Sequence, residues 1–212
     1  MSKSEKLKAC GMSECKLRGK SKGKSNLKGI NMEKNFILAG FGGQGILFAG
    51  KILANAFMFL GKNVTWYPCY GAEMRGGTVN CEIVVSDDEV SSVHKSDADC
   101  VVALNQLSFD RFISKIKTGG KIICNSSLIK KIMPRSDIEY TFFPMTGKAV
   151  ELGNFKLANM VSLGVLAGVE NILSTEILKK AIDIVLPAER KHLIDINLNA
   201  ILAGCVRAVP VC

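Results

Sequence analysis

The sequence lacks the features of a membrane protein, a secreted protein or a protein that binds a metal cluster within one chain. No apolar run reaches the ~18 residues of a membrane helix, and the longest stretch, 46–60, is interrupted by Lys51 and Asn55. The start is charged from the third residue and has no apolar signal core, which predicts a cytoplasmic protein. The eight cysteines form no C-x-x-C pair, so the usual spacing for an iron–sulfur or zinc site is absent.

Histidine is also scarce, and the cysteines are scattered. The two histidines, His94 and His192, are far apart in polar surroundings, so we expect neither a catalytic nor a metal-binding role for them. Cys100 and Cys124 lie in strand-like apolar runs. We interpret them as buried free thiols of a protein in a reducing cell interior.

The net charge of +9 is concentrated at the N-terminus. Residues 1–31 contain nine Lys/Arg against two Glu, whereas residues 32–212 contain nineteen Lys/Arg against seventeen Asp/Glu. The segment 1–34 is rich in Lys, Ser and Gly and is predicted to be disordered. It is either a basic tail for nucleic acid or an acidic partner, or an extension of the gene ahead of a natural start at Met32. The nearly balanced remainder gives no reason to expect nucleic-acid binding.

The remaining chain predicts one folded domain over 35–207, followed by a short tail over 208–212. Apolar runs alternate with helical patterns, and the last third is helical. We therefore expect an α/β fold: a Rossmann-like, mostly parallel sheet with helices on both faces and a helical C-terminal third. The predicted strands are 36–40, 62–68, 79–86, 99–105, 121–125 and 139–143. The predicted helices are 44–60, 107–117, 149–152, 158–172, 175–186 and 197–206, with Ser174 or Thr175 as a helix cap.

A glycine-rich turn matching G-x-G-x-x-G directly follows the first predicted strand and opens a helix. Glycine permits a sharp turn and a close approach of backbone N–H groups to an anion, and the helix N-terminus adds a positive dipole end. The candidate phosphate-binding residues are Gly40, Gly42, Gly43, Gln44 and Gly45. A tight strand–helix turn without a ligand is the alternative. No acid follows strand two between Val64 and Cys69, which argues against nicotinamide binding.

A second glycine-rich segment, 70–78, reads Tyr-Gly-Ala-Glu-Met-Arg-Gly-Gly-Thr. Its glycines favour a loop held close to another backbone or to a ligand. The alternative is a connection whose charged side chains are solvated. The candidate residues are Tyr70, Glu73, Arg75, Gly76, Gly77 and Thr78.

The two segments together resemble the gamma subunit of 2-oxoacid:ferredoxin oxidoreductases. Gly-Gly-Gln-Gly before a helix and Tyr-Gly-Ala-Glu-Met-Arg-Gly-Gly-Thr after the second strand carry the resemblance. Further matches are Ala-Leu-Asn at 103–105, the segment 119–126, Glu-Leu-Gly-Asn at 151–154 with Asn-Met at 159–160, and Leu-Gly at 163–164. The form of the second segment is most similar to the 2-oxoglutarate (2-oxoglutarate synthase) type.

The resemblance implies a hetero-oligomeric enzyme that oxidatively decarboxylates a 2-oxoacid to an acyl-CoA and CO₂, with electrons passing to ferredoxin. Such a complex is expected to use thiamine diphosphate, Mg²⁺, an iron–sulfur cluster and coenzyme A, none of them held by this chain alone. The expected partners are alpha and beta subunits, with a ferredoxin-like delta subunit as a further candidate. We expect no nucleic acid and no membrane as partners. The sequence contains neither a G-D-G…N-N pattern nor clustered cysteines, so it predicts a non-catalytic subunit.

Two interpretations of the glycine-rich segments remain open from the sequence. In one, the turn binds a phosphate of coenzyme A and Arg75 adds a charge-assisted contact. In the other, both segments contact partner subunits, and Glu73 pairs with Arg75 or with a basic residue of a partner. A stand-alone Rossmann-like module that binds a nucleotide or phosphate is the alternative to the subunit interpretation.

Overall fold

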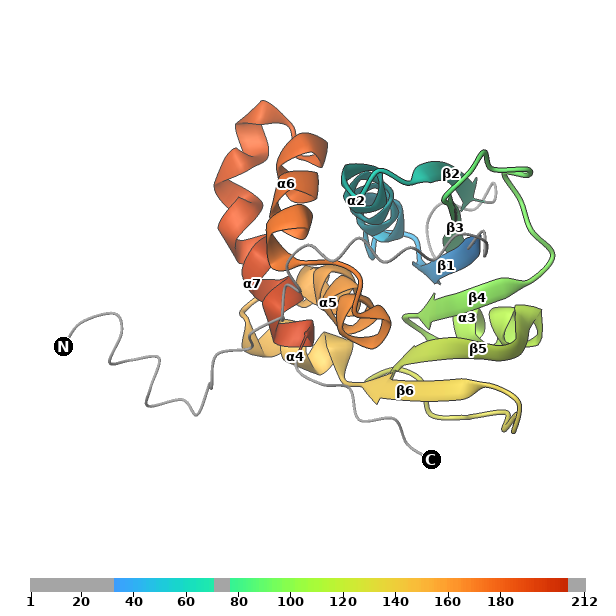
Figure 1. Cartoon of the computed structure of the whole chain (residues 1–212). Helices are drawn as coiled ribbons and strands as arrows, with labels where there is room; N and C mark the ends of the chain where they lie inside the picture. The colour runs from blue at the N-terminus through green and yellow to red at the C-terminus, as the bar shows by residue number, and fades with distance from the viewer. Residues whose placement is uncertain (1–32, 71–76, 206–212) are drawn as a thin grey trace.

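The computed structural model describes residues 33–70 and 77–205, which form one six-stranded sheet with helices packed on it (Figure 1). The strand order is β2-β3-β1-β4-β5-β6. The strands are β1 (Lys34–Phe41), β2 (Asn63–Tyr70), β3 (Thr78–Ser86), β4 (Ala98–Ala103), β5 (Ile116–Asn125) and β6 (Glu139–Phe143). The helices are α2 (Ile46–Phe59), α3 (Gln106–Phe112), α4 (Met145–Glu151), α5 (Ala158–Glu170), α6 (Thr175–Val185) and α7 (Ile194–Gly204). Short 3-10 turns are η1 (Ile113–Lys115), η2 (Phe155–Leu157) and η3 (Ala188–Leu193).

The sheet is mostly parallel, as the sequence predicts. β1, β4, β5 and β6 pair in parallel, whereas β3 is antiparallel to both of its neighbours, β1 and β2. Five of the six described strands therefore run in one direction. In a dinucleotide-binding fold the first two strands are adjacent in the sheet. Here the antiparallel β3 lies between β1 and β2.

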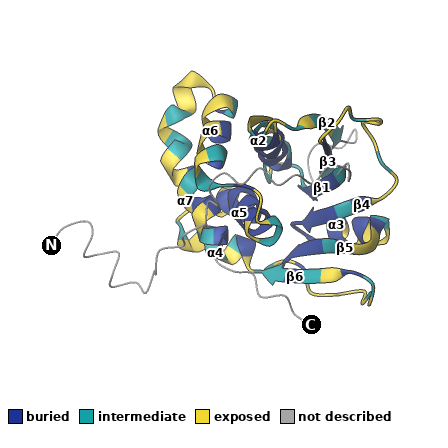
Figure 2. Cartoon of the chain, viewed as in Figure 1, coloured by how far each residue is buried: buried dark blue, intermediate teal, exposed yellow. Residues whose placement is uncertain are grey.

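Helices cover both faces of the sheet, but unequally. Side chains alternate between the faces along each strand, so Phe36 and Leu38 of β1 enter one core and Ile37 enters the other. The larger core lies under α2, α4, α5, α6 and α7, and the smaller one under α3 and η1. Figure 2 shows the resulting buried colouring in the central strands and along α5.

The helical last third packs without a second sheet. Residues 158–167 of α5 are all buried, and α7 crosses α5 at two glycines. A Cβ added to Gly164 would lie 1.9 Å from the Ile201 carbonyl oxygen, and one added to Gly204 would lie 2.1 Å from the Val161 carbonyl oxygen. These contacts bring the two helix backbones into direct contact. At the start of α6, the Ser174 hydroxyl accepts from the Ile177 N–H at 3.4 Å, which confirms the predicted cap.

Several boundaries differ from the sequence prediction, most of all around the fifth strand. β5 begins at Ile116 rather than at residue 121, so Gly119 and Gly120 lie within this strand, at an irregularity in its pairing with β4. Gly119 takes a left-handed conformation there (φ 76°), which glycine permits without strain. The helix predicted over 107–117 ends earlier because β5 already begins at Ile116.

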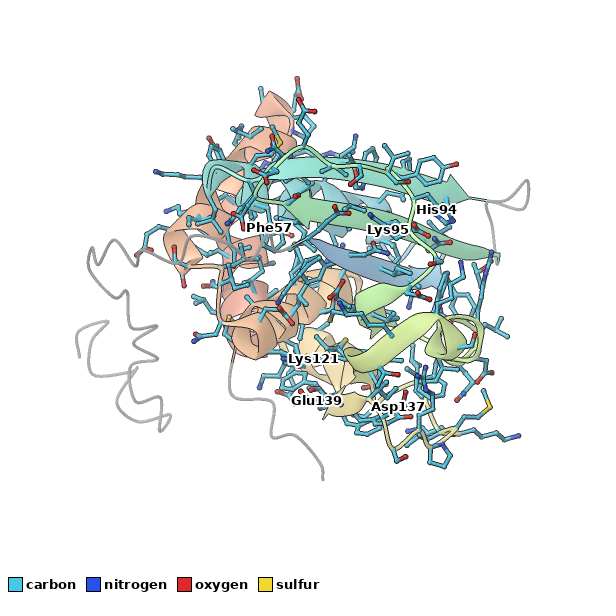
Figure 3. The ribbon with its side chains drawn as sticks, turned by 45° about the vertical axis from the view of Figure 1, so that its right-hand side comes forward. Phe57, His94, Lys95, Lys121, Asp137 and Glu139 are labelled. Atoms are coloured by element: carbon cyan, nitrogen blue, oxygen red, sulfur yellow. The ribbon has the colours of Figure 1, made fainter. Side chains whose placement is uncertain are left out.

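The predicted leader and tail fall almost wholly outside the described residues. Residues 1–32, 71–76 and 206–212 are not described. Of the segment 1–34, the structure describes Glu33 and Lys34, and Lys34 is the first residue of β1. Its ammonium group forms an ion pair of 2.7 Å with Glu170. At the same end of the sheet, Lys121 of β5 lies 3.9 Å from the same Glu170 and next to Glu139 of β6 (Figure 3) at 3.7 Å.

Candidate functional site

The first glycine-rich segment and the two described ends of the second lie at the carboxyl edge of the sheet. β1 ends there at Phe41, β2 ends there at Tyr70, and the antiparallel β3 begins there at Thr78. Phe41 and Thr78 are direct partners in the β1–β3 ladder. Ligands of open α/β sheets bind outside the carboxyl ends of the strands. The structure thus places the glycine turn beside the described end of the second segment, at the edge where this fold class binds ligands.

The glycine turn is closed by its own glutamine. The Gln44 side-chain oxygen accepts from the Phe41 N–H at 2.7 Å, and the Gln44 N–H donates to the Phe41 carbonyl at 3.1 Å. A Cβ on Gly40 would lie 2.6 Å from that side-chain oxygen. Gly43 and Gly45 have φ of 94° and 72°, in the region that favours glycine. Gln44 and Gly40 therefore determine the shape of the turn, and Gly43 and Gly45 supply the left-handed backbone conformations that it needs.

The turn has few free donors. The Gly42 N–H donates to the Gly77 carbonyl at 3.2 Å, which ties the turn to the end of the second segment. Among the described residues, no acceptor is found for the N–H groups of Gly43 and Gly45. Gly45 precedes α2 and has no side chain to cap it, and the first turn of α2 contains no acid. The open N–H groups and the helix dipole make this the anion-accepting part of the edge.

Of the second segment, only its two ends are described. Glu73, Arg75 and Gly76 lie outside the described residues, as does the side chain of Tyr70. Gly77 is held by Gly42, and the Thr78 hydroxyl accepts a hydrogen bond of 2.8 Å from Arg111 of α3. Arg111 therefore adds a cation to this edge.

A row of neutral amides continues the edge across the other strands. Asn105, after β4, caps α3 through the Ser108 N–H (2.9 Å) and reaches the Gln44 side chain at 3.4 Å. Asn125, at the end of β5, donates to the Leu104 carbonyl at 3.0 Å. It also donates to the Thr146 hydroxyl of α4 at 2.8 Å.

Asn159 of α5 extends this row to the glycine turn. Its side chain donates to the Gly45 carbonyl at 3.0 Å, although the two residues are 114 positions apart in the sequence. A Cβ on Gly45 would lie 2.3 Å from the Asn159 side-chain nitrogen. The helical last third therefore fixes the position of the turn.

Sequence reasoning did not assign Asn105, Asn125, Asn159 or Arg111 to the site. The asparagines belong to segments that carried the family resemblance, and Asn105 has the pattern of a helix cap, so a signal existed. For Arg111, one cation on an exposed helix, the sequence contains no such signal.

The cysteine thiols of the sheet strands are not activated for nucleophilic or metal chemistry. Burial, with Glu82 adding to it, raises the pKa of the Cys69 thiol near the end of β2. Burial also raises the pKa of Cys81 and of Cys124 to about 12 and raises that of Cys100. These thiols therefore stay protonated at neutral pH. Within residues 33–70 and 77–205, no group of three or more His, Cys, Asp or Glu side chains is placed to hold a metal ion.

One acid–histidine contact lies behind this edge on β3. Glu82 is buried, with 2% of its side chain exposed, and His94 contacts it at 2.6 Å. Figure 3 labels His94 and Lys95 on the connection that follows β3. The connection that follows β3 thus supplies a polar partner for a buried carboxylate, and the side chain of His94 itself is 55% exposed.

The sheet with its glycine turn defines a Rossmann-like α/β domain whose site lies at the carboxyl edge. Residues 35–206 match the protein family described as pyruvate ferredoxin/flavodoxin oxidoreductase. The chain belongs to this family, and the predicted resemblance to the gamma subunit is confirmed by the relatives and solved structures that follow.

The relatives differ in size. The 2-oxoglutarate synthase subunit KorC of Methanocaldococcus jannaschii is 36% identical over 160 residues, which cover 74% of this chain and 86% of KorC. The ketoisovalerate oxidoreductase subunit VorA of Methanothermobacter thermautotrophicus is 36% identical over 168 residues, 79% of this chain but 35% of VorA. The chain thus spans about a third of the length of the VorA relatives that it matches.

A solved structure has the same fold. The gamma subunit of a keto/oxoacid ferredoxin oxidoreductase from Geobacter sulfurreducens superposes with a TM-score of 0.73 at 28% identity. The alignment covers 84% of this chain and 97% of that subunit. Among the residues that our structure describes, no helix has the length and apolarity needed to span a bilayer.

Proposed function

We propose that the chain is a non-catalytic gamma subunit of a 2-oxoacid:ferredoxin oxidoreductase complex. The complex would oxidatively decarboxylate a 2-oxoacid to an acyl-CoA and CO₂ and pass the electrons to ferredoxin. One observation carries the proposal: the described edge site consists of backbone groups, neutral amides and the cation of Arg111. The glycine turn, Asn105, Asn125 and Asn159 include no carboxylate, imidazole or thiolate that could move a proton or attack a substrate.

The cofactors of such a complex would be held by the partner chains. The described residues offer no metal-binding cluster, and the thiols with raised pKa do not fit an iron–sulfur cluster, which needs thiolates. Thiamine diphosphate, Mg²⁺ and the cluster are therefore assigned to alpha and beta subunits and, where present, a ferredoxin-like delta subunit.

For the substrate, we propose 2-oxoglutarate. Four relatives are named 2-oxoglutarate synthase subunit KorC, with 30–36% identity. Other relatives are named for ketoisovalerate and pyruvate. The sequence form of the segment 70–78 favours the 2-oxoglutarate type among these.

Within the complex, the glycine turn and the second segment would form a wall against the partner subunits. Gly42 and Gln44 already donate within the chain, which favours a shaped contact surface over a cradle with many donors. The open N–H groups of Gly43 and Gly45 at the start of α2 favour a second role, in which they hold a phosphate of coenzyme A. An added Cβ at Gly43 would meet nothing within 4 Å, so a ligand can approach that backbone closely.

The test is purification of the native, oxygen-free complex through a tag on this chain. Co-purification of thiamine-binding and iron–sulfur subunits is expected, together with coenzyme A-dependent dye reduction that is fastest with 2-oxoglutarate among 2-oxoglutarate, ketoisovalerate and pyruvate. A chain that purifies without such partners and binds a nucleotide or phosphate by itself would establish the stand-alone module instead.

The two proposed roles of the edge, partner contact and phosphate binding, can be distinguished with the variant Arg75→Ala in the assembled complex. Arg190→Ala on η3 removes the same charge elsewhere and serves as the control. A raised KM for coenzyme A in an intact complex supports phosphate binding. Loss of assembly with an unchanged KM in the remaining complex supports the interface.

A further inference from the structure

A second surface adjoins the carboxyl edge and combines apolar and cationic side chains. It consists of Leu107 and Arg111 on α3 and of Lys130, Lys131, Ile132 and Met133 on the connection between β5 and β6; we call it the basic-apolar face. Leu107, Ile132 and Met133 are 54%, 48% and 54% exposed. Leu107 and Arg111 lie one helical turn apart and so share one side of α3. The face begins directly after Asn105, so it continues the amide row of the edge.

Gln106 joins the two halves of this face. Its side-chain oxygen accepts from the N–H groups of Lys130 and Lys131, both at 3.0 Å. Its side-chain nitrogen donates to the Lys131 carbonyl at 2.8 Å. These bonds hold the connection against the first turn of α3 and so place Lys130 and Lys131 near Leu107.

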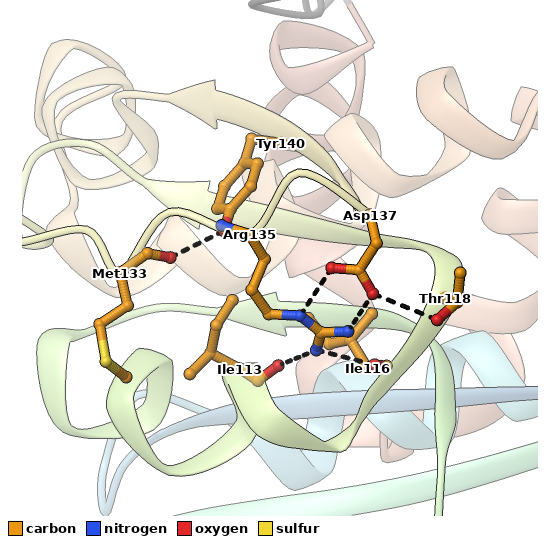
Figure 4. Close-up of polar contacts among 7 residues, drawn as sticks. All are labelled: Ile113, Ile116, Thr118, Met133, Arg135, Asp137 and Tyr140. Carbon is orange, nitrogen blue, oxygen red and sulfur yellow. Dashed lines mark hydrogen bonds and ion pairs between the residues drawn. The ribbon is translucent and has the colours of Figure 1, made fainter.

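The far end of the connection is fixed by Arg135 (Figure 4). Its guanidinium donates to the carbonyls of Ile113 (2.8 Å) and Ile116 (2.9 Å) and pairs with Asp137 at 2.6 Å. The Tyr140 hydroxyl donates to the Met133 carbonyl at 2.8 Å. Because both ends are held, Ile132 and Met133 are presented on an ordered backbone, and binding to them loses little conformational entropy.

The charge on this face is not neutralised within the described chain. Among the described ion pairs none involves Arg111, Lys130 or Lys131, and the Lys130 ammonium donates instead to the Ser126 carbonyl at 3.0 Å. Two acids of this part of the chain are already engaged, since Asp137 pairs with Arg135 and Asp110 accepts from Gln106 at 2.9 Å. Apolar side chains among unpaired cations match an interface whose partner supplies carboxylates around an apolar centre.

We infer that the basic-apolar face is buried in the assembled enzyme against an acidic surface of another subunit. This inference rests on the proposed function for the existence of the assembly, and the position of the face beside the carboxyl edge makes it a continuation of the same contact. Arg111 connects the two regions, because it also donates to Thr78 at the end of the second glycine-rich segment.

The experiment uses the purified native complex and a carbodiimide, which joins lysine amines directly to carboxylates in contact with them. Peptide mass spectrometry is expected to find Lys130 or Lys131 joined to Asp or Glu of another subunit. Two consecutive exposed lysines on another helix, Lys179 and Lys180 of α6, are the control and are expected to form no such link. The inference is overturned if Lys130 and Lys131 form no such link and are acetylated as readily in the complex as in the isolated chain.

A variant provides the second measurement. The double variant Lys130→Glu with Lys131→Glu should weaken the binding of this chain to the subunit that covers the basic-apolar face by at least about tenfold. The control variant Lys179→Glu with Lys180→Glu should leave this binding unchanged. Equal behaviour of the two variants, with native circular dichroism for both, contradicts the inference. A complex with these links but no 2-oxoacid-dependent activity would overturn the proposed function alone. An active complex with both lysines free would overturn this inference alone, and a chain that assembles with nothing would overturn both.

Discussion

Replacing Gly45 with alanine tests whether the helical last third holds the glycine turn in place. The left-handed backbone (φ 72°) costs alanine about 1 kcal/mol. The new Cβ would lie 2.3 Å from the Asn159 side-chain nitrogen, so this amide must move and lose its hydrogen bond to the Gly45 carbonyl. Because Asn159 is only 6% exposed, leaving it unpaired costs about 1–3 kcal/mol more. The sum is about 2–4 kcal/mol.

Gly43→Ala is the matched control. Its backbone is also left-handed (φ 94°), but an added Cβ meets nothing within 4 Å, so only the backbone strain of about 1 kcal/mol remains. At about 2–4 °C per kcal/mol for a chain of this size, Gly45→Ala should lower Tm by about 4–16 °C. Gly43→Ala should lower Tm by about half as much or less.

The assay is thermal or urea unfolding of the full chain, followed by circular dichroism. Asn159→Ala combined with Gly45→Ala removes the group that the new methyl meets, so the double variant should be no less stable than Gly45→Ala alone. Equal losses for Gly43→Ala and Gly45→Ala, or additive losses in the double variant, would refute the contact between turn and helix as the cause.

Three further outcomes follow from the described contacts. Gly164→Ala should destabilise the chain by several kcal/mol, because its Cβ would lie 1.9 Å from a carbonyl of α7. In Gly168→Ala the added Cβ would lie 3.4 Å from the Cys205 carbonyl oxygen, an ordinary contact, so this variant should be neutral or stabilising by up to about 1 kcal/mol in denaturant titrations. The hydrogen bond from Arg135 lowers the pKa of Asp137. As the pH falls, the Asp137 carboxylate is therefore protonated in the unfolded chain before it is protonated in the folded chain, and the free energy of unfolding should decrease below about pH 4. Asp137→Asn should flatten this dependence of stability on pH, and an unchanged dependence would contradict the assignment. Cys100 is fully buried with a raised pKa, so iodoacetamide should modify it only at the rate of unfolding; rapid modification of the native chain would show that the strand opens.

Local patterns in the sequence were sufficient where one segment determines its own structure. The G-x-G-x-x-G spacing predicted a turn between β1 and α2, and the structure has it there because only glycine takes the left-handed conformations at Gly43 and Gly45 without strain. The range 139–143 predicted for the last strand is that of β6. Ser174 was predicted from the same local chemistry that makes hydroxyls good helix caps.

Non-local pairing could not be predicted in this way. The alternation within β3 indicates a strand, but it does not show that this strand separates β1 from β2, since an inserted antiparallel strand and an edge strand have similar patterns. The hydrogen bond between the Gln44 side chain and the Phe41 N–H was also not predicted from the motif, and the role of Gln44 in phosphate binding stays a prediction. The contact between Asn159 and Gly45 bridges 114 positions and leaves no local trace.

The hydrogen bond from Gly42 to Gly77 joins the glycine turn to the described end of the second segment. Because β3 runs back along β1, this end lies beside the place where the turn begins, so a shift of the turn would strain the start of β3. Transplanting the turn alone into another Rossmann-like sheet would therefore remove the support of its Gly42 N–H. The smallest transferable part of this edge is β1 with its turn together with β3, and a protein engineer who wishes to retune it would have to redesign both strands at once.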